Sequence, residues 1–263
     1  MINKESSEIT TMEIEEKEYV MGLEKGLTII EAFGHRKAPM TLTQAAEITG
    51  HTKASVRRCL LTLCKLGYVA QTGRQFQLAP RALRLGHAYV SSDPLTKVAQ
   101  PILEMTSERT KESASLAVLD AQDAVFVARS THRRSLSSGL GVGARLPAYC
   151  SATGRVLLSA QPKAYVEFLL NRMARPAFTP HTLTSMKDVL REIHLVQKRG
   201  YAISDEELEI GLRSIAVPVR NAAGDVIAAL SLSVLTSRMT REAVIDELLP
   251  EMETARRHFA MLL

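Results

Sequence analysis

The N-terminal third of the chain carries apolar residues at helical spacing. A first helix is predicted over residues 23–34, with one apolar face formed by Leu23, Leu27, Ile30 and Phe33. A second, shorter helix is predicted after Thr41, because Thr41 and Gln44 have the spacing of a capping box. Gly50 ends that helix and supplies a turn.

A longer helix is predicted from Thr52 or Lys53 to Gly67. Its apolar stripe repeats every three or four residues, at Val56, Leu60, Leu63 and Leu66. The pattern changes to that of a strand at Tyr68, and residues 72–73, Thr-Gly, mark a hairpin tip. Two helices joined by a glycine turn and followed by a hairpin are typical of a winged helix-turn-helix. In this motif the second helix enters the major groove of DNA.

The chain downstream of the hairpin predicts a linker and a second domain. Pro80 opens a helix over residues 81–91 whose inward side is formed by Ala82, Leu85 and Tyr89. Residues 91–94, Ser-Ser-Asp-Pro, interrupt the helical pattern. The predicted organisation is a flexible tail over residues 1–20, a winged helix-turn-helix domain over 21–80, a linker helix over 81–93 and a second domain over 94–263.

The second domain mixes strand and helix patterns. Its first helix is marked by Leu95, Val98, Ile102 and Met105. Strands are predicted at residues 115–119, 125–128, 135–140, 215–219 and 226–234. Helices are predicted at residues 151–160, 164–171 and 185–198 and from 240 towards the C-terminal end, with a kink at Pro250. Sequential hairpins with flanking helices indicate an α+β fold built on an antiparallel sheet.

Positive charge is concentrated on the helix-turn-helix segment. The chain has a net charge of +5, and residues 22–90 hold ten Lys or Arg against three Glu. Residues 91–263 hold 21 basic and 19 acidic residues, so they are nearly neutral. This distribution favours a polyanionic partner at the N-terminal domain, and double-stranded DNA is the partner that the motif predicts.

The candidate DNA contacts lie on the polar side of the motif. They are Thr41, Thr43, Gln44, Thr52, Lys53, Ala54, Ser55, Arg57, Arg58 and, at the hairpin tip, Arg74. Arginine can hold guanine O6 and N7 through two hydrogen bonds, and phosphates bind any of the cations. An isolated amphipathic helix with a solvated charged face would look similar. The preceding helix, the following hairpin and the local charge favour DNA binding.

Several other classes of protein are disfavoured. Three cysteines at irregular spacing make neither a disulfide framework nor a zinc site. The sequence has no signal peptide and no apolar run long enough for a membrane span, which predicts a cytoplasmic protein with no membrane partner. Neither a metal ion nor another cofactor is predicted.

No catalytic constellation is evident, so the chain is not expected to be an enzyme. The glycines of residues 139–143 lack the helix of a dinucleotide-binding motif. Asp205, Glu206, Glu207 and Glu209 are interpreted as a solvated acidic turn rather than a metal site. Cys150 has no neighbouring His or Asp pattern that would make it a nucleophile and is interpreted as a partly buried small residue.

The chemistry of the second domain is better explained by anion capture. Residues 151–154, Ser-Ala-Thr-Gly, start a predicted helix whose first turn offers unpaired N–H groups and a positive dipole end. The hydroxyls of Ser151 and Thr153 add hydrogen-bond donors. Simple N-capping by Ser151 is an equally good interpretation of that residue. Arg133 and Arg134 could supply a second cationic contact, although an exposed arginine pair is the commoner situation.

Several separated segments resemble the IclR family of bacterial transcriptional regulators. They are residues 22–30, the helix-turn-helix, residues 145–158 and residues 199–218, in the family's order and covering about residues 20–260. The resemblance implies a winged-helix N-terminal domain, a GAF-like effector-binding domain, and homodimers or homotetramers on palindromic operators. Residues 139–150 are most similar to regulators of aromatic-acid and β-ketoadipate catabolism, whose effectors are protocatechuate, β-ketoadipate or 4-hydroxybenzoate. Repression of another carboxylic-acid or sugar-acid operon is the first alternative, and a small-molecule-binding enzyme is the second.

The resemblance also implies an effector site. The positions that match it are Tyr149, Cys150, Ser151, Ala152, Thr153, Gly154, Ser204, Asp205, Leu212, Ser214, Ser231 and Ser233. Ser204 stands where a family member of the glyoxylate or pyruvate type carries an aspartate. This departure argues against a small keto acid as the effector.

Overall fold

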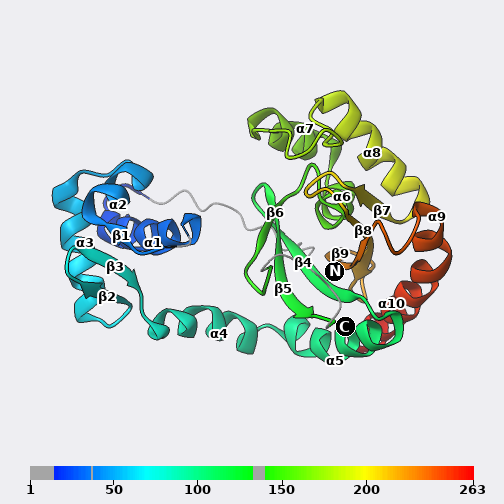
Figure 1. Cartoon of the computed structure of the whole chain (residues 1–263), viewed down its shortest axis with the longest axis horizontal. Helices are drawn as coiled ribbons and strands as arrows, with labels where there is room; N and C mark the ends of the chain where they lie inside the picture. Colours follow the sequence, from blue (N-terminus) through cyan, green and yellow to red (C-terminus); the bar gives the residue numbers. More distant parts are fainter. Residues whose placement is uncertain (1–14, 37, 133–139) are drawn as a thin grey trace. The chain divides into compact units, whose positions relative to one another are not determined.

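The computed structural model describes residues 15–36, 38–132 and 140–263. The chain divides into two compact units, residues 1–87 and 88–263 (Figure 1). The division lies inside α4 (Leu83–Ser92), which leads from one unit to the next after a short 3-10 turn, η2 (Pro80–Ala82). Among the described residues, the N-terminal unit has one buried apolar cluster and the C-terminal unit has three, and no cluster contains residues of both units.

The N-terminal unit is a winged helix-turn-helix. Its elements are α1 (Met21–Ala32), η1 (Phe33–His35), β1 (Met40–Thr41), α2 (Leu42–Thr49), α3 (Lys53–Lys65), β2 (Val69–Thr72) and β3 (Gln75–Leu78). The predicted capping box is present: the Thr41 hydroxyl accepts from Gln44 N at 3.3 Å, and Gln44 Oε1 accepts from Thr41 N at 2.9 Å. Gly50 has a φ of 68°, a conformation that suits glycine and that turns the chain towards α3.

The apolar face predicted for the first helix is confirmed at Phe33, which is buried, and at Ile30, which packs partly buried against the same core, and it is wrong at Leu23 and Leu27. Leu23 and Leu27 are 62% and 47% exposed, whereas Ile29 and Ala32 are buried against α3 and α2. The helix has apolar residues on two sides, and sequence spacing alone could not say which side packs inward. The inward residues predicted for α4 are also wrong, since Leu85 and Tyr89 are exposed and α4 has no buried residue.

The C-terminal unit is built on a six-stranded sheet whose paired strands are all antiparallel, in the order β6-β5-β4-β9-β8-β7. The strands are β4 (Ser113–Asp120), β5 (Asp123–Ser130), β6 (Arg145–Pro147), β7 (Ala202–Asp205), β8 (Leu212–Arg220) and β9 (Val226–Leu235). This confirms the α+β class with an antiparallel sheet. The hairpins β4–β5 and β8–β9 match the predicted ones, whereas β6 and β7 were not predicted. Residues 135–139 of the predicted strand at 135–140 lie outside the described residues.

Helices cover both faces of this sheet. They are α5 (Pro94–Thr110), α6 (Ala152–Ser159), α7 (Lys163–Arg172), α8 (Met186–Arg199), α9 (Arg241–Ala243), the π-helical turn η3 (Val244–Leu248) and α10 (Leu249–Leu262). Helices α5 and α10 lie side by side against one face (Figure 1). The other face meets α6, which buries Val156 and Leu157 against small residues of β4, β8 and β9. Within the described residues, no helix combines the length and apolarity needed to cross a membrane.

Candidate functional site

Helix α3 presents a cationic face on the side away from the core. Val56, Leu60 and Leu63 are buried, while Lys53, Arg57 and Arg58 are exposed on the opposite side. In the described part of the chain no salt bridge involves Lys53, Arg57, Arg58 or Arg74. These charges are therefore available to an anionic partner.

The other predicted DNA residues divide into exposed positions and capping positions. Thr43 and Ala54 are exposed, and Ser55 is half-buried. The side chains of Thr41, Gln44 and Thr52 accept hydrogen bonds from backbone N–H groups as helix caps, and the Thr52 hydroxyl accepts from Ser55 N at 3.3 Å. These three residues position the two helices.

Arg74 sits at the tip of the β2–β3 wing. The tip is a tight turn in which Gly73 has a φ of 59°, and the Gln71 amide donates to the Gly73 carbonyl at 2.9 Å. This bond fixes the turn and leaves Arg74 exposed at the end of the hairpin.

A cavity of about 280 Å³ lies between the sheet and the start of α6. It is lined by Phe126, Arg129, Leu140, Arg145, Leu146, Pro147, Ser151, Ala152, Thr153, Phe178, Ser204, Leu208, Glu209, Leu212, Ser214, Ser231 and Ser233. Its walls are largely apolar, and its polar groups are hydroxyls together with two arginines and one glutamate. A cavity of this composition suits a small, partly apolar molecule that carries polar oxygens.

Serine hydroxyls form the polar part of the sheet face below this cavity. One row of directly paired residues crosses the four strands β4, β9, β8 and β7 as Ser113, Ser233, Ser214 and Ser204. A second row, two residues along, contains Arg129 on β5, Ser115 on β4 and Ser231 on β9. Directly paired residues point to the same face, and positions two apart along a strand do so as well. Both rows therefore share the α6 side of the sheet.

Arg129 is the cation at the β5 end of these rows. Its Nη1 donates to Ser115 Oγ at 3.0 Å, and its guanidinium lies 5.4 Å from the centre of the Phe126 ring. Burial lowers the pKa of Arg129, because desolvation disfavours the charged form. Arg145 also lines the cavity, but Asp120 and Asp123 bind it at 2.6 Å and 2.9 Å. Its charge is therefore already compensated.

The N-terminus of α6 supplies further polar groups to the cavity wall. The Ser151 hydroxyl caps the helix by accepting from Gly154 N at 3.1 Å, and it donates to the Pro147 carbonyl at 2.8 Å. The Thr153 residue is 2% exposed, and its Oγ1 atom has no hydrogen-bond partner among the described residues. A buried hydroxyl without a partner is costly, so this group indicates a ligand or a water molecule in the cavity.

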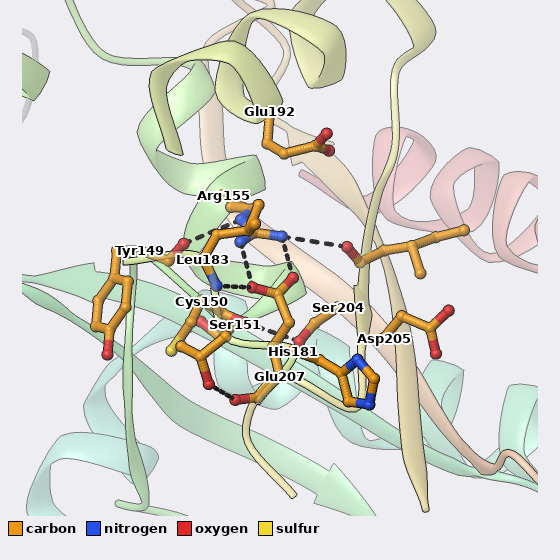
Figure 2. Close-up of polar contacts among 12 residues, drawn as sticks. Tyr149, Cys150, Ser151, Arg155, His181, Leu183, Glu192, Ser204, Asp205 and Glu207 are labelled. Carbon is orange, nitrogen blue, oxygen red and sulfur yellow. Dashed lines mark hydrogen bonds and ion pairs between the residues drawn. The ribbon is translucent and has the colours of Figure 1, made fainter. Parts of the chain in front are cut away.

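A buried ion pair connects two segments that contribute residues to the cavity, α6 and the loop between β7 and β8. Arg155, on α6, binds both oxygens of Glu207 at 2.5 Å and 2.7 Å, and Arg155 Nε donates to the Tyr149 carbonyl at 3.0 Å (Figure 2). Glu207 also accepts from Leu183 N at 3.1 Å. The pair thus joins α6 to the loop between β7 and β8, which carries the cavity residues Leu208 and Glu209. The predicted solvated acidic turn is wrong for Glu207, which is buried.

Eight of the predicted effector residues line the cavity: Ser151, Ala152, Thr153, Ser204, Leu212, Ser214, Ser231 and Ser233. Four others do not line it: Tyr149, Cys150, Gly154 and Asp205. Arg133 and Arg134 lie outside the described residues.

The residues that miss the cavity have other contacts. Tyr149 is buried and its hydroxyl donates to the Pro176 carbonyl, while burial raises its pKa. Burial also raises the pKa of the Cys150 thiol to about 12, so the thiol stays protonated and is a poor nucleophile. Asp205 binds Arg213 Nε at 2.7 Å. None of these three side chains lines the cavity.

Gly154 packs so closely against the backbone of Ala148 that no side chain fits there, which gives a testable prediction. A Cβ atom here would overlap the Cα of Ala148 and lie 2.5 Å from its carbonyl oxygen. Gly154→Ala is expected to destabilise the C-terminal unit by at least about 1–3 kcal/mol, because backbone would have to move. Urea unfolding measures this. Gly86→Ala in α4, where no atom lies within 4 Å, is the matched control and should leave stability unchanged or slightly higher. Equal stabilities of the two variants would contradict the prediction.

Two family models match the chain. "IclR helix-turn-helix domain" covers residues 22–73, and "Bacterial transcriptional regulator IclR C-terminal" covers residues 87–260. The "Pca regulon regulatory protein" of Pseudomonas putida is 42% identical over 91% of this chain and 83% of the relative. The "p-hydroxybenzoate hydroxylase transcriptional activator" of Acinetobacter baylyi is 39% identical over 90% of each chain.

Solved structures agree with these matches. A transcriptional regulator from Rhodococcus sp. RHA1 is 39% identical with a TM-score of 0.80, covering 93% of this chain and 98% of that one. The inducer-binding domain of a PobR transcription factor double mutant from Acinetobacter, in complex with 3-hydroxybenzoic acid, is 34% identical with a TM-score of 0.60. That comparison covers 64% of this chain and 98% of that one.

Proposed function

Because the chain belongs to the IclR family of bacterial transcriptional regulators, we propose that it controls the transcription of genes for aromatic-acid catabolism in response to an aromatic acid. In this proposal residues 21–80 bind operator DNA, residues 81–93 link the domains and residues 94–263 bind the effector. The relatives named for the Pca regulon and for p-hydroxybenzoate hydroxylase support the pathway. No catalytic step is proposed for the cavity.

The observation that carries the effector proposal is the composition of the α6 cavity. Aromatic and aliphatic walls suit a ring, while the serine rows, Arg129 and the Thr153 hydroxyl suit its polar oxygens. A volume of about 280 Å³ is near the lower end for ligand pockets, which suits a single-ring acid.

Thermal-shift screening tests the effector proposal. Protocatechuate, 4-hydroxybenzoate, β-ketoadipate and related acids should include at least one that raises Tm, since a ligand that binds only the folded state stabilises it. Sugar acids and pyruvate serve as the comparison set. A shift produced only by the comparison set would favour the alternative, a regulator of another carboxylic-acid or sugar-acid operon.

The cationic face of α3 gives a second prediction. Arg57→Ala is expected to weaken operator binding and to reduce the slope of log affinity against log salt by about one if Arg57 contacts a phosphate. If it contacts a guanine, discrimination against a changed base should fall by about 1–3 kcal/mol instead. Titration of labelled operator and of scrambled DNA at several salt concentrations separates the two roles.

Two controls accompany this prediction. Lys163→Ala removes an exposed charge from α7 in the other unit and should leave DNA binding unchanged. The effector-induced Tm shift of Arg57→Ala should equal that of the wild type. Unchanged operator affinity in Arg57→Ala would remove this residue from the interface.

We also propose that the regulator acts in the cytoplasm as a homodimer or homotetramer on a palindromic operator. Helix-turn-helix dimers bind half-sites about one helical turn apart, so operator symmetry reflects protein symmetry. Light scattering with and without operator measures the assembly.

A further inference from the structure

We propose that a groove between α1 and α3 is the docking site of the acidic segment that precedes α1, and that the docked segment competes with DNA for Arg58. This contact within the chain goes beyond effector control, because it lowers DNA affinity without any effector. It rests on the proposed DNA binding for that consequence only, since the docking itself is measurable without DNA.

The groove is an open, largely apolar hollow on the surface of the winged helix. It lies where α1 packs against α3 and has a volume of about 490 Å³ (Figure 1). Leu23, Leu27 and Leu66 line it, although they are 62%, 47% and 50% exposed. Gly22 and Gly26, one turn apart on the α1 wall, have no atom within 4 Å of where a Cβ would lie. Exposed apolar side chains gathered around a hollow indicate an interaction site.

The charged groups at this groove are cationic. Lys25 and Arg58 line it, and none of the described residues that line it is acidic. Within the described ranges, neither cation belongs to a salt bridge. Arg58 is also a candidate DNA contact, so an anion bound at the groove competes with a DNA phosphate for the same guanidinium.

The segment before α1 has a composition that matches this groove. Residues 5–18 contain six Glu and one Lys, and the apolar residues Ile9, Met12 and Ile14 are interspersed with the glutamates. The apolar side chains suit the leucines of the groove wall, and the carboxylates suit its two cations. A second copy of the winged helix, docked symmetrically, would bring its own two cations to the same place, and like charges repel. The acidic segment is therefore the better match.

The chain enters α1 through a turn, which brings the groove within reach of this segment. Glu18 N donates to the Glu15 carbonyl at 2.8 Å and closes the turn just before α1 begins at Met21. A turn of this kind reverses the chain direction. The 12 residues of α1 make a helix about 18 Å long, and the six residues 9–14 reach about 20 Å when extended. The segment is therefore long enough to lie beside the whole of α1.

The covalent connection makes even a weak contact effective. A segment on a short tether has an effective concentration in the millimolar range, so a dissociation constant of about 0.1–0.2 mM keeps the groove covered for roughly 80–90% of the time. The groove is then open for the remaining tenth to fifth. DNA binding at Arg58 and chemical modification of groove atoms are both expected to be reduced by that factor, about 5- to 10-fold.

Thiol modification of the full chain tests the docking without DNA. Cys59 lines the groove, whereas Cys64 is half-buried outside it and serves as the internal reference. The tail variant combines four substitutions that remove charge and keep size: Glu8→Gln, Glu13→Gln, Glu15→Gln and Glu16→Gln. N-ethylmaleimide, a neutral reagent, is expected to modify Cys59 about 5- to 10-fold faster in the tail variant than in the wild type, with no change at Cys64. Peptide mass spectrometry separates the two sites.

A random-sequence duplex of about 30 base pairs measures the consequence for DNA, because phosphate contacts do not depend on sequence. Leu27→Gln makes the groove wall polar without changing any charge. The tail variant and Leu27→Gln are each expected to raise duplex affinity at low salt by about 5- to 10-fold. The combined variant should gain no more than either alone, because both changes release the same segment. Leu27→Gln should also speed the modification of Cys59.

A matched variant controls for net charge. It removes four exposed acidic charges from the C-terminal unit through Glu104→Gln, Glu242→Gln, Asp246→Asn and Glu247→Gln. This variant should change neither the modification rate of Cys59 nor the duplex affinity. Thermal unfolding identifies any variant that fails to fold, and Leu23→Gln, at a more exposed position of the same wall, then replaces Leu27→Gln.

Each contrary result has a distinct meaning. Equal modification rates of Cys59 in the wild type and the tail variant would overturn the docking. A gain in duplex affinity from the tail variant alone, or gains that add in the combined variant, would overturn it in favour of long-range repulsion. Protection of Cys59 that fades on dilution would overturn it in favour of a second copy. If Cys59 is protected but no variant binds the duplex, the docking stands and the proposed DNA binding fails.

Discussion

Glu207→Ala is expected to lower the stability of the C-terminal unit by about 3–5 kcal/mol. Arg155 and Glu207 side chains are only 1% and 7% exposed, so removing the carboxylate leaves a buried, uncompensated guanidinium. Leu183 N loses its acceptor as well. For a unit of this size the expected fall in Tm is about 6–20 °C. Differential scanning calorimetry of the full chain measures it.

Two variants separate the charge from the packing. The double replacement Arg155→Met with Glu207→Leu removes both charges and keeps apolar volume, so it should recover most of the lost stability. Arg109→Ala breaks an ion pair with Glu251 whose side chains are 53% and 30% exposed, and should cost about 1 kcal/mol or less. A Glu207→Ala protein as stable as the Arg109→Ala protein would refute the structural role assigned to the buried pair.

Loss of the Arg155–Glu207 pair is also expected to weaken effector binding in the double variant. The pair fixes the loop that brings Leu208 and Glu209 to the cavity, so its removal frees the cavity wall. Stability would be largely restored in that variant, and any remaining fall in effector affinity reports positioning. Unchanged effector affinity would show that the loop is held by its other bonds, such as Thr182 Oγ1 to the Glu207 carbonyl at 2.6 Å.

Leu60→Ala is expected to unfold or severely loosen the winged helix, with a cost of about 2–5 kcal/mol. Leu60 is 0% exposed at the centre of the small core between α1, α2 and α3, and a cavity there has few neighbours that can collapse into it. Operator binding should be lost, because the cationic face of α3 depends on that packing. Gel-shift titration and hydrogen exchange measure the two effects.

The effector response of the C-terminal unit serves as the control for Leu60→Ala. Its cores share no residue with the core of the winged helix, so the effector-induced Tm shift should remain. Leu61→Ala, one residue along α3 and 41% exposed, should change stability by no more than about 0.5 kcal/mol. Loss of effector response in Leu60→Ala would contradict the independence of the two units.

Local sequence signals predicted most of the helices and hairpins because their causes are local. The Thr41 capping box, the Gly50 turn and the stripe of α3 depend on neighbours within a few residues. The exposure of Leu23 and Leu27 in α1 and of the apolar residues of α4 could not be obtained in this way, because both helices carry apolar residues on more than one side. The buried role of Glu207 was missed because its partner, Arg155, is 52 residues away.

The sequence by itself determined the two-part plan and the winged helix-turn-helix, and its resemblance to the IclR family pointed to the hydroxyl-bearing segments that line the cavity. Only the tertiary structure showed that Arg129 lines the cavity together with these hydroxyl groups. Phe126 and Arg129 are three residues apart, and strict strand alternation would place them on opposite faces. A β-bulge between β4 and β5 shifts the register at Leu116 and Ala117, so that Phe126 pairs with Ala117 and Arg129 with Ser115 on the same face. An inserted residue in one strand changes orientation through pairing with another strand, which the spacing along a single strand does not encode.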